Sequence, residues 1–290
     1  MSESGGNENL SVRLHDGRRV RYAQYGVTDG FPILNCHGGL ACRLDVAAAD
    51  SIAKDNGVTL ISPDRPGIGG SDHKAGRTIL DWADDVTEVM DLISVDRFAV
   101  MGWSMGGQYA AAVGRALVPR VSRVAIIAGA LPLTEPGVFA RLPTFDRVYT
   151  RLSQRAPRAA RLCFRSMGLA AGAFPTWYGR LAAGGLGDAD GKVIRDEGYG
   201  AFARMSAEAM RQPEGVVEDY RAWMRPWGFA PEDLAVPVEV WAGEHDELVD
   251  KAWEIELARR IPGASLQLRQ GGHFLAHLHY GEIFTNLMRR

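Results

Sequence analysis

Hydrophobic and polar residues follow two different rhythms along this chain of 290 residues. Residues 18–25 alternate polar and apolar side chains, as a half-buried strand does, whereas 32–36 and 58–62 are apolar runs of buried-strand length. Other segments place an apolar residue at every third or fourth position, which is typical of amphipathic helices. The predicted strands are residues 18–25, 32–36, 58–62, 97–101, 121–128, 236–242 and 264–268, and the predicted helices are residues 43–55, 82–93, 104–117 and 249–260 and a C-terminal segment.

The order of these elements indicates the fold class. Repeated strand, helix, strand units favour a parallel sheet that helices cover on both faces, an α/β architecture. This rhythm stops after residue 131 and resumes at 236, and the segment between is helical in character, with five interrupting prolines. We therefore predict one α/β domain, residues 1–131 and 230–290, into which a helical segment of residues 132–229 is inserted. Within the insert, residues 182–191 contain four Gly and two Asp and are expected to form a loop.

Composition and charge exclude several classes of protein. Hydrophobic residues make up 46% and charged residues 23%, which excludes a disordered chain, and a net charge of -2 argues against a nucleic-acid partner. The three cysteines follow no zinc spacing, so we expect reduced thiols. The first residues lack the features of a signal peptide, and the longest nearly apolar run, 124–133, is too short to cross a bilayer. We expect a cytoplasmic protein with no integral membrane segment.

Arginines are concentrated in one part of the insert. Residues 141–165 contain seven Arg and one acidic residue, Asp146. This pattern favours a solvated helix face or a contact between subunits over a funnel for anionic substrates or a membrane-facing patch. Self-association is left open.

The sequence Gly-Trp-Ser-Met-Gly at residues 102–106 follows a predicted strand and opens a predicted helix. In this context a G-x-S-x-G match indicates a nucleophile elbow, a sharp turn that exposes the serine hydroxyl above a sheet. A Cβ on either flanking glycine would strike the neighbouring strand or helix. Ser104 would also lie at a helix N-terminus, where developing negative charge is stabilised.

A serine nucleophile needs a base, and the base needs an orienting carboxylate. Asp246 follows the strand 236–242 and His273 follows the strand 264–268, so both would reach the carboxyl edge of the sheet, where Ser104 is expected. Glu244 is a rival for the acid, and Asp246 has an alternative role as a helix N-cap. His277 and His279 are rivals for the base, but they lie deeper in the last helix, where packing or snorkelling is expected.

The oxyanion that forms during acyl transfer needs two N–H donors. One is expected from Met105, the residue after the serine, and the other from Gly39, in the loop after the strand 32–36. His37 in the same loop is expected to fix the loop by a hydrogen bond and not to act as the base.

Together these motifs resemble the α/β-hydrolase fold superfamily. The resemblance covers the chain outside the insert and rests on residues 37–39, 63–72, 102–107, 243–246 and 272–274, in the family's order. It implies a mostly parallel eight-stranded sheet with helices on both faces and residues 132–229 as a helical cap over the site. Haloalkane dehalogenases and epoxide hydrolases carry Asp at the elbow in place of Ser104, and proline iminopeptidases differ after Gly39, so these branches are disfavoured.

We therefore expect a serine hydrolase that cleaves a carboxylic ester or related acyl bond of a small substrate. Because the insert is rich in aromatic residues and Met, the substrate is expected to be partly apolar. The residues expected to contact it are Leu40, Trp103, Trp223 and Trp227. No cofactor is expected, and no metal, since the spacing of His273 and His277 lacks the Glu of a zinc-protease helix. A C–C bond hydrolase or other cofactor-free enzyme on the same triad, or a capped non-catalytic receptor, is the alternative.

Overall fold

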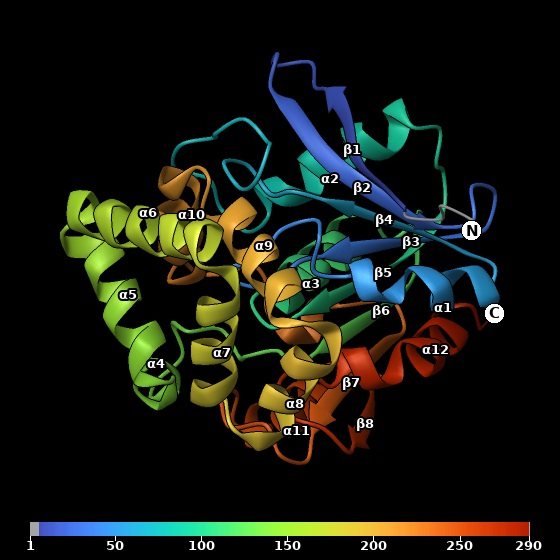
Figure 1. Cartoon of the computed structure of the whole chain (residues 1–290). Coiled ribbons are helices and arrows are strands. Elements are labelled where there is room, and N and C mark those ends of the chain that lie inside the picture. The colour runs from blue at the N-terminus through green and yellow to red at the C-terminus, as the bar shows by residue number, and fades with distance from the viewer. Residues whose placement is uncertain (1–5, 290) are drawn as a thin grey trace.

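The computed structural model describes residues 6–289, which form an eight-stranded sheet with helices on both faces (Figure 1). The strand order is β1-β2-β4-β3-β5-β6-β7-β8. The strands are β1 (Asn7–Arg13), β2 (Arg19–Gly26), β3 (Phe31–Cys36), β4 (Val58–Pro63), β5 (Phe98–Trp103), β6 (Val121–Ile127), β7 (Val238–Gly243) and β8 (Ser265–Arg269). Only β2 runs antiparallel to its neighbours, β1 and β4. The predicted mostly parallel sheet is confirmed.

Strand β1 is not among the strands that the hydrophobic pattern of the sequence predicts. It pairs with β2 at the sheet edge, with Leu10 opposite Tyr22 and Val12 opposite Val20. Its side chains alternate between exposed and half-buried, and none is fully buried. An edge strand of this kind needs few apolar residues, so its hydrophobic signal is weak.

Strands β3 to β7 are buried on both faces by two sets of helices. Consecutive residues of β3 show the division. Ile33 belongs to the buried cluster that includes residues of α1 (Asp50–Asp55) and α12 (Ala276–Leu287), and Leu34 belongs to the cluster that includes residues of α2 (Asp81–Leu92), α3 (Gly106–Ala116) and α11 (Lys251–Arg260). Residues 43–46, expected at the start of the first helix, form a loop instead, and the helical turns begin with η1 (Ala47–Ala49). The Arg43 amide of this loop donates to Asp64 Oδ1 at 2.7 Å.

A block of helices, called the cap below, is inserted between β6 and β7 and stands to one side of the sheet (Figure 1). It consists of α4 (Val138–Arg141), α5 (Thr144–Arg155), α6 (Pro157–Ala173), α7 (Pro175–Gly185), α8 (Asp188–Glu197), α9 (Tyr199–Ala209) and α10 (Pro213–Trp223), and η2 (Pro231–Asp233) leads back to β7. The loop expected at residues 182–191 is wrong, because only residues 186 and 187 separate α7 from α8. Gly191 allows α8 to pack closely against α7, since a Cβ at this position would lie 2.3 Å from Ala183 O.

The cap shares its apolar core with the sheet. One continuous cluster of buried residues joins Phe164, Tyr220 and Trp223 of the cap to Leu34 and Tyr109 below the site. Burial of this kind fixes the cap on the sheet without a disulfide among the described residues. Within residues 6–289, no helix has the length and apolar composition needed to cross a bilayer.

Candidate active site

Ser104 occupies a sharp turn between β5 and α3. Its φ of 55° is in the left-handed region, and its amide donates to Ile127 O at 2.8 Å. A Cβ on Gly102 would lie 2.3 Å from Gly106 O, and one on Gly106 would lie 1.9 Å from Cys36 O. The expected steric need for both glycines is therefore confirmed, and the turn holds a strained serine above the sheet edge.

The structure brings Ser104, His273 and Asp246 together from the ends of three strands. His273 Nε2 lies 2.8 Å from Ser104 Oγ, and His273 Nδ1 lies 2.9 Å from Asp246 Oδ2. The Asp246 side chain is fully buried, and His273 is only 5% exposed. Because the carboxylate accepts the Nδ1 proton, Nε2 is left to accept the proton of the serine hydroxyl.

Asp246 is fixed by its own turn. Its Oδ1 accepts the amides of Leu248 at 2.8 Å and Val249 at 2.9 Å, which leaves Oδ2 for the histidine. The N-cap of α11 is Asp250 and not Asp246.

The rival residues are engaged elsewhere. Glu244 bonds with the side chain of Gln270, and the ring of His277 pairs with Glu197. His279 Nε2 donates to Gln270 O at 2.8 Å. Among these side chains, none has Ser104 as its hydrogen-bonding partner.

Charge around His273 favours its protonated form. Burial alone lowers the pKa of this imidazole, but Asp246 acts in the opposite direction, with further contributions from Asp190 and Asp146 of the cap. The net result is a pKa above the ordinary histidine value. Three carboxylates thus stabilise the imidazolium that would form when the serine loses its proton.

Gly39 and Met105, the residues expected to supply the two oxyanion donors, are neighbours in space. A Cβ on Gly39 would be 3.2 Å from Met105 Cε and 3.6 Å from Met105 Cβ. Within residues 6–289, neither the Gly39 nor the Met105 amide donates a hydrogen bond to another protein group. The preceding amide, that of Gly38, is already used: it donates to Asp45 Oδ2 at 3.2 Å, and Asn35 Nδ2 donates to Asp45 Oδ1 at 2.8 Å.

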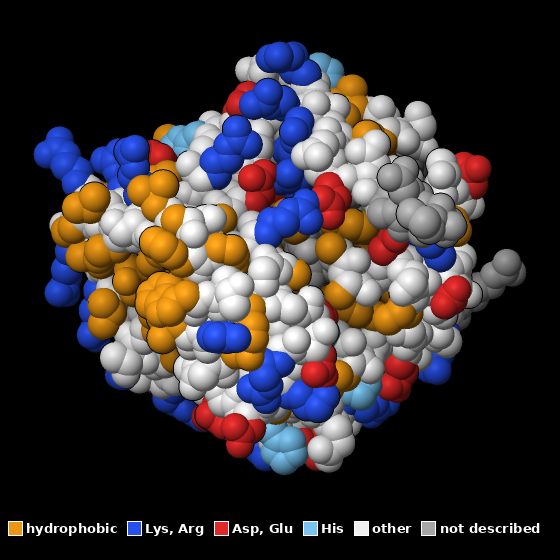
Figure 2. Space-filling view, in the orientation of Figure 1, with side chains coloured by type: hydrophobic (Ala, Val, Ile, Leu, Met, Phe, Trp, Pro, Cys, Tyr) orange, Lys and Arg blue, Asp and Glu red, His pale blue; other side chains and the backbone are white. Residues whose placement is uncertain are grey.

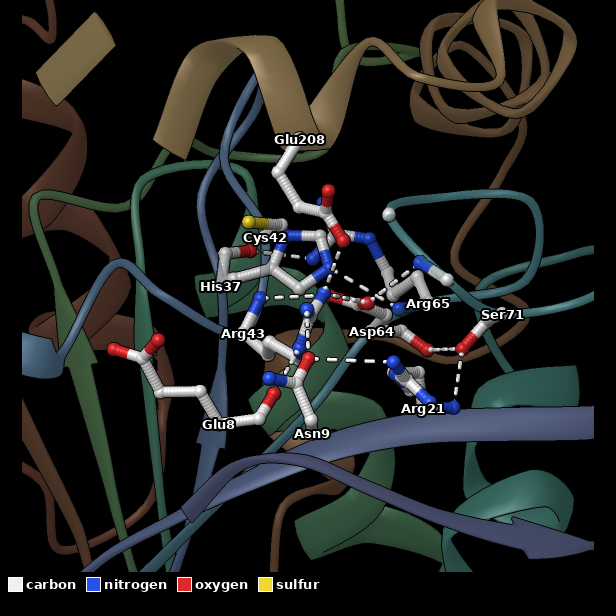
Figure 3. A network of polar contacts seen from close by, with 12 residues as sticks. Glu8, Asn9, Arg21, His37, Cys42, Arg43, Asp64, Arg65, Ser71 and Glu208 are labelled. Atoms are coloured by element: carbon white, nitrogen blue, oxygen red, sulfur yellow. Dashed lines mark hydrogen bonds and ion pairs between the residues drawn. The ribbon is translucent and has the colours of Figure 1, made fainter. Parts of the chain in front are cut away.

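His37 and Arg65, both labelled in Figure 3, hold this loop together with a buried ion cluster. His37 Nε2 accepts the Arg65 amide at 3.1 Å and Nδ1 donates to Gly38 O at 3.0 Å, as expected of a loop-fixing residue. Burial first, and then the charge of Arg65, keep its pKa well below the ordinary value. The Arg65 guanidinium donates to the His37 and Gly38 carbonyls and pairs with Asp219 of α10, which also binds Arg77 at 2.6 Å. Nothing in the sequence points to a role for Asp219, whereas the signal for Arg65 is its place in the 63–72 motif.

Asp190 of α8 was also missed. Its Oδ2 accepts the His273 amide at 2.9 Å and its Oδ1 accepts the Phe274 amide at 2.8 Å. The carboxylate is 1% exposed. Because residues 182–191 were expected to form a loop, nothing in the sequence pointed to a cap residue at the histidine.

Leu40 and Trp103 lie at the edges of the site. Leu40 is half-buried with a φ of 54°. Trp103 Nε1 donates to His273 O at 2.7 Å, and the two rings are 5.4 Å apart. Trp103 also lines a cavity of about 220 Å³ together with Phe202, Met205 and Phe274.

Trp223 and Trp227 are buried in the apolar cluster below the cap, at 6% and 2% exposure. Trp227 Nε1 donates to Gln108 Oε1 at 3.2 Å, and the Trp223 ring is 6.0 Å from that of Tyr220. Their contact with a substrate stays a prediction.

Comparison with known proteins identifies the family of this chain. Residues 32–280 match the family model described as alpha/beta hydrolase fold. The chain belongs to the α/β-hydrolase fold family. The resemblance found in the sequence is thereby confirmed, and the protein is a hydrolase enzyme. No curated protein is significantly similar to it in sequence.

Solved structures match this α/β hydrolase over nearly its whole length. The enol-lactonase from Burkholderia xenovorans LB400 is 19% identical with a TM-score of 0.71, over 96% of this chain and 98% of that one. A bromoperoxidase from Bacillus anthracis is 17% identical with a TM-score of 0.72, over 97% and 100%. An N-acyl homoserine lactone degrading enzyme is 25% identical with a TM-score of 0.61, over 96% and 99%. Among residues 6–289, no group of three His, Cys, Asp or Glu side chains is arranged to hold a metal ion.

Proposed function

We propose that this α/β hydrolase is a serine esterase that cleaves a carboxylic ester or related acyl bond with Ser104, His273 and Asp246. The observation that carries the proposal is the continuous pair of hydrogen bonds, 2.8 Å from Ser104 Oγ to His273 Nε2 and 2.9 Å from His273 Nδ1 to Asp246. This arrangement is the one that activates a serine hydroxyl.

The reaction follows from these contacts. Ser104 Oγ attacks the carbonyl carbon while His273 Nε2 takes its proton, and the N–H groups of Gly39 and Met105 bind the oxyanion. His273 then protonates the leaving alcohol as the C–O bond breaks, which leaves an acyl-enzyme. Water repeats the cycle with His273 as base and releases the acid. Asp246 keeps the imidazole oriented and stabilises its cation throughout.

A small, neutral, partly apolar acyl group is the proposed substrate. Apolar side chains at the histidine support this, because the rings of Trp103 and Phe274 lie 5.4 and 6.2 Å from the ring of His273. A lactone is a cyclic ester that needs the same chemistry, and two structurally similar proteins are an enol-lactonase and an N-acyl homoserine lactone degrading enzyme. Lactone hydrolysis is therefore the second candidate. The three free thiols in the described residues support a cytoplasmic location.

The test combines covalent labelling with a substrate panel. A fluorophosphonate should label the wild-type enzyme and the Ser166→Ala control, whose serine is exposed on α6, but not Ser104→Ala. Turnover of p-nitrophenyl esters of graded chain length and of lactones should fall by several orders of magnitude in Ser104→Ala.

Labelling that survives Ser104→Ala would overturn the nucleophile assignment. If the enzyme cleaves the C–C bond of a diketone but hydrolyses no ester of the panel, a C–C bond hydrolase would be favoured. Tight binding of panel compounds without turnover would favour a receptor.

A further inference from the structure

Large apolar side chains are exposed along α6 and α7 of the cap. Figure 2 shows hydrophobic side chains gathered there, with Lys and Arg side chains around them. The patch, called the cap face below, contains Leu162, Leu169, Phe174, Trp177 and Leu181, which are 58–66% exposed. Residues 172–177 are all exposed and form the corner between the two helices. Contiguous exposed apolar surface of this kind marks an interaction site.

The spacing of these residues makes the cap face a single surface. Leu162 and Leu169 are seven positions apart on α6, and Phe174, Trp177 and Leu181 follow at intervals of three and four along α7. Each set therefore shares one face of its helix. Their neighbours on the buried sides, Phe164 and Ala171, pack inside the cap.

A positively charged groove adjoins the cap face. It measures about 1050 Å³, and Leu169 and Pro175 line it together with residues of β1, β2, α9 and α10. Its charged residues are five arginines and two glutamates: Arg21, Arg43, Arg165, Arg204, Arg211, Glu208 and Glu214. Arg43 pairs with Asp64 and Glu208 in Figure 3, whereas Arg165 and Arg211 form no ion pair with a residue in 6–289.

The arginines around the cap face indicate which partner binds it. A second copy bound symmetrically through this face would bring two arginine-rich helices, each with Arg158 and Arg165, against each other, and that repulsion is costly. An anionic surface is attracted to the same arginines. Tryptophan and phenylalanine beside arginine are typical of segments that lie in a membrane interface.

We propose that the cap face docks this enzyme peripherally on a bilayer that contains anionic phospholipids. Phe174, Trp177 and Leu181 enter the interface, and Arg165 and Arg211 bind lipid phosphates at the groove. For Arg165 the proposal departs from the sequence-based preference for a solvated helix face or a subunit contact. The inference does not depend on the catalytic residues.

Vesicle co-sedimentation tests the proposal. The full chain should sediment with vesicles of phosphatidylcholine and phosphatidylglycerol, but not with phosphatidylcholine alone, and salt should weaken the binding. The double variant Phe174→Ser/Trp177→Ser and the double variant Arg165→Glu/Arg211→Glu should each bind about tenfold more weakly or worse. The controls Leu278→Ser, at a side chain also 58% exposed but on α12, and Arg115→Glu, on α3, should bind like wild type.

A conservative variant guards against misfolding. Brominated phosphatidylglycerol should quench part of the wild-type tryptophan fluorescence, and Trp177→Phe should remove most of that quenching. The proposal is overturned if folded wild-type protein does not bind anionic vesicles. It is also overturned if the control variants lose as much binding as the two double variants. It is also overturned by a dimer in sedimentation equilibrium that Phe174→Ser/Trp177→Ser dissociates.

Discussion

The Asp190 carboxylate of cap helix α8 accepts the backbone amide of His273 at 2.9 Å. The residue that would act as the base is thus held by the cap as well as by its own strand end. A Cβ on Gly272 would lie 2.5 Å from Asp190 Oδ1, so glycine at this position is what allows the carboxylate to approach. The cap therefore takes part in building the site.

We expect Asp190→Ala to lower kcat by about 10- to 100-fold with a smaller change in KM, because a small displacement of the base costs this much. Asp190→Asn keeps one acceptor oxygen and should fall between wild type and Asp190→Ala. Steady-state kinetics on a p-nitrophenyl ester measure the effect, and Asp188→Ala, an exposed residue of the same helix, is the control. A folded Asp190→Ala enzyme with wild-type kcat would contradict this role.

The contrast between Asp190 and Ser104 shows what the sequence can reveal. Ser104, Asp246 and His273 each lie within four residues of the end of a strand, so local patterns place them at one sheet edge. Asp190 and His273 are 83 residues apart in the sequence, and Asp219 and Arg65 are 154 residues apart. Such contacts depend on how the cap helices pack, which periodicity within one segment does not encode.

The pH dependence of the reaction should report on Asp146. Its Oδ1 accepts the Tyr220 hydroxyl at 3.1 Å, and its charge helps to raise the pKa of His273. Only the neutral imidazole acts as base, so activity appears as the pH rises through that raised pKa. Asp146→Asn removes a negative charge, lowers the pKa of His273 and should move the acid limb of kcat/KM to lower pH. Glu244→Gln is the control, and an acid limb that stays in place or moves to higher pH would argue against the effect.

Removing the charge of Asp219 should be strongly destabilising. The carboxylate lies between Arg65 and Arg77, and all three side chains are at most 4% exposed. Asp219→Asn leaves two buried guanidinium groups with less compensation, and breaking such a pair costs about 3–5 kcal/mol. Urea denaturation measures the loss, with Glu218→Gln on the same helix as the matched variant. A loss below about 1 kcal/mol would mean that water reaches the cluster.

Glu254 on α11 offers a pH-dependent stability test. Burial, with a smaller contribution from Asp246, raises its pKa to about 9, and among the described residues neither carboxyl oxygen has a hydrogen-bond partner. The folded state therefore holds a proton that the unfolded state loses above its value of 4.5, so stability falls as the pH rises from about 5 to 9.

Glu254→Gln removes this dependence. Each pKa unit is worth about 1.4 kcal/mol, so the variant should match wild type near pH 4 and exceed it by on the order of 3 kcal/mol at pH 7. Urea denaturation at both pH values measures the difference, and Glu256→Gln, at a half-buried residue of the same helix, should show no such trend. An equal difference at the two pH values would count against a buried neutral Glu254.

The hydrogen bonds of Arg65 to the loop at His37, and its ion pair with Asp219, have a consequence for protein engineering. Because one cap carboxylate supports the loop of the proposed oxyanion donors and another, Asp190, supports the loop of the proposed base, the insert is not an exchangeable module. A chimaera that joined this sheet to the cap of another family member would lose both anchors. Grafts that retain α8 and α10 and replace only α5 to α7 leave the two anchors intact.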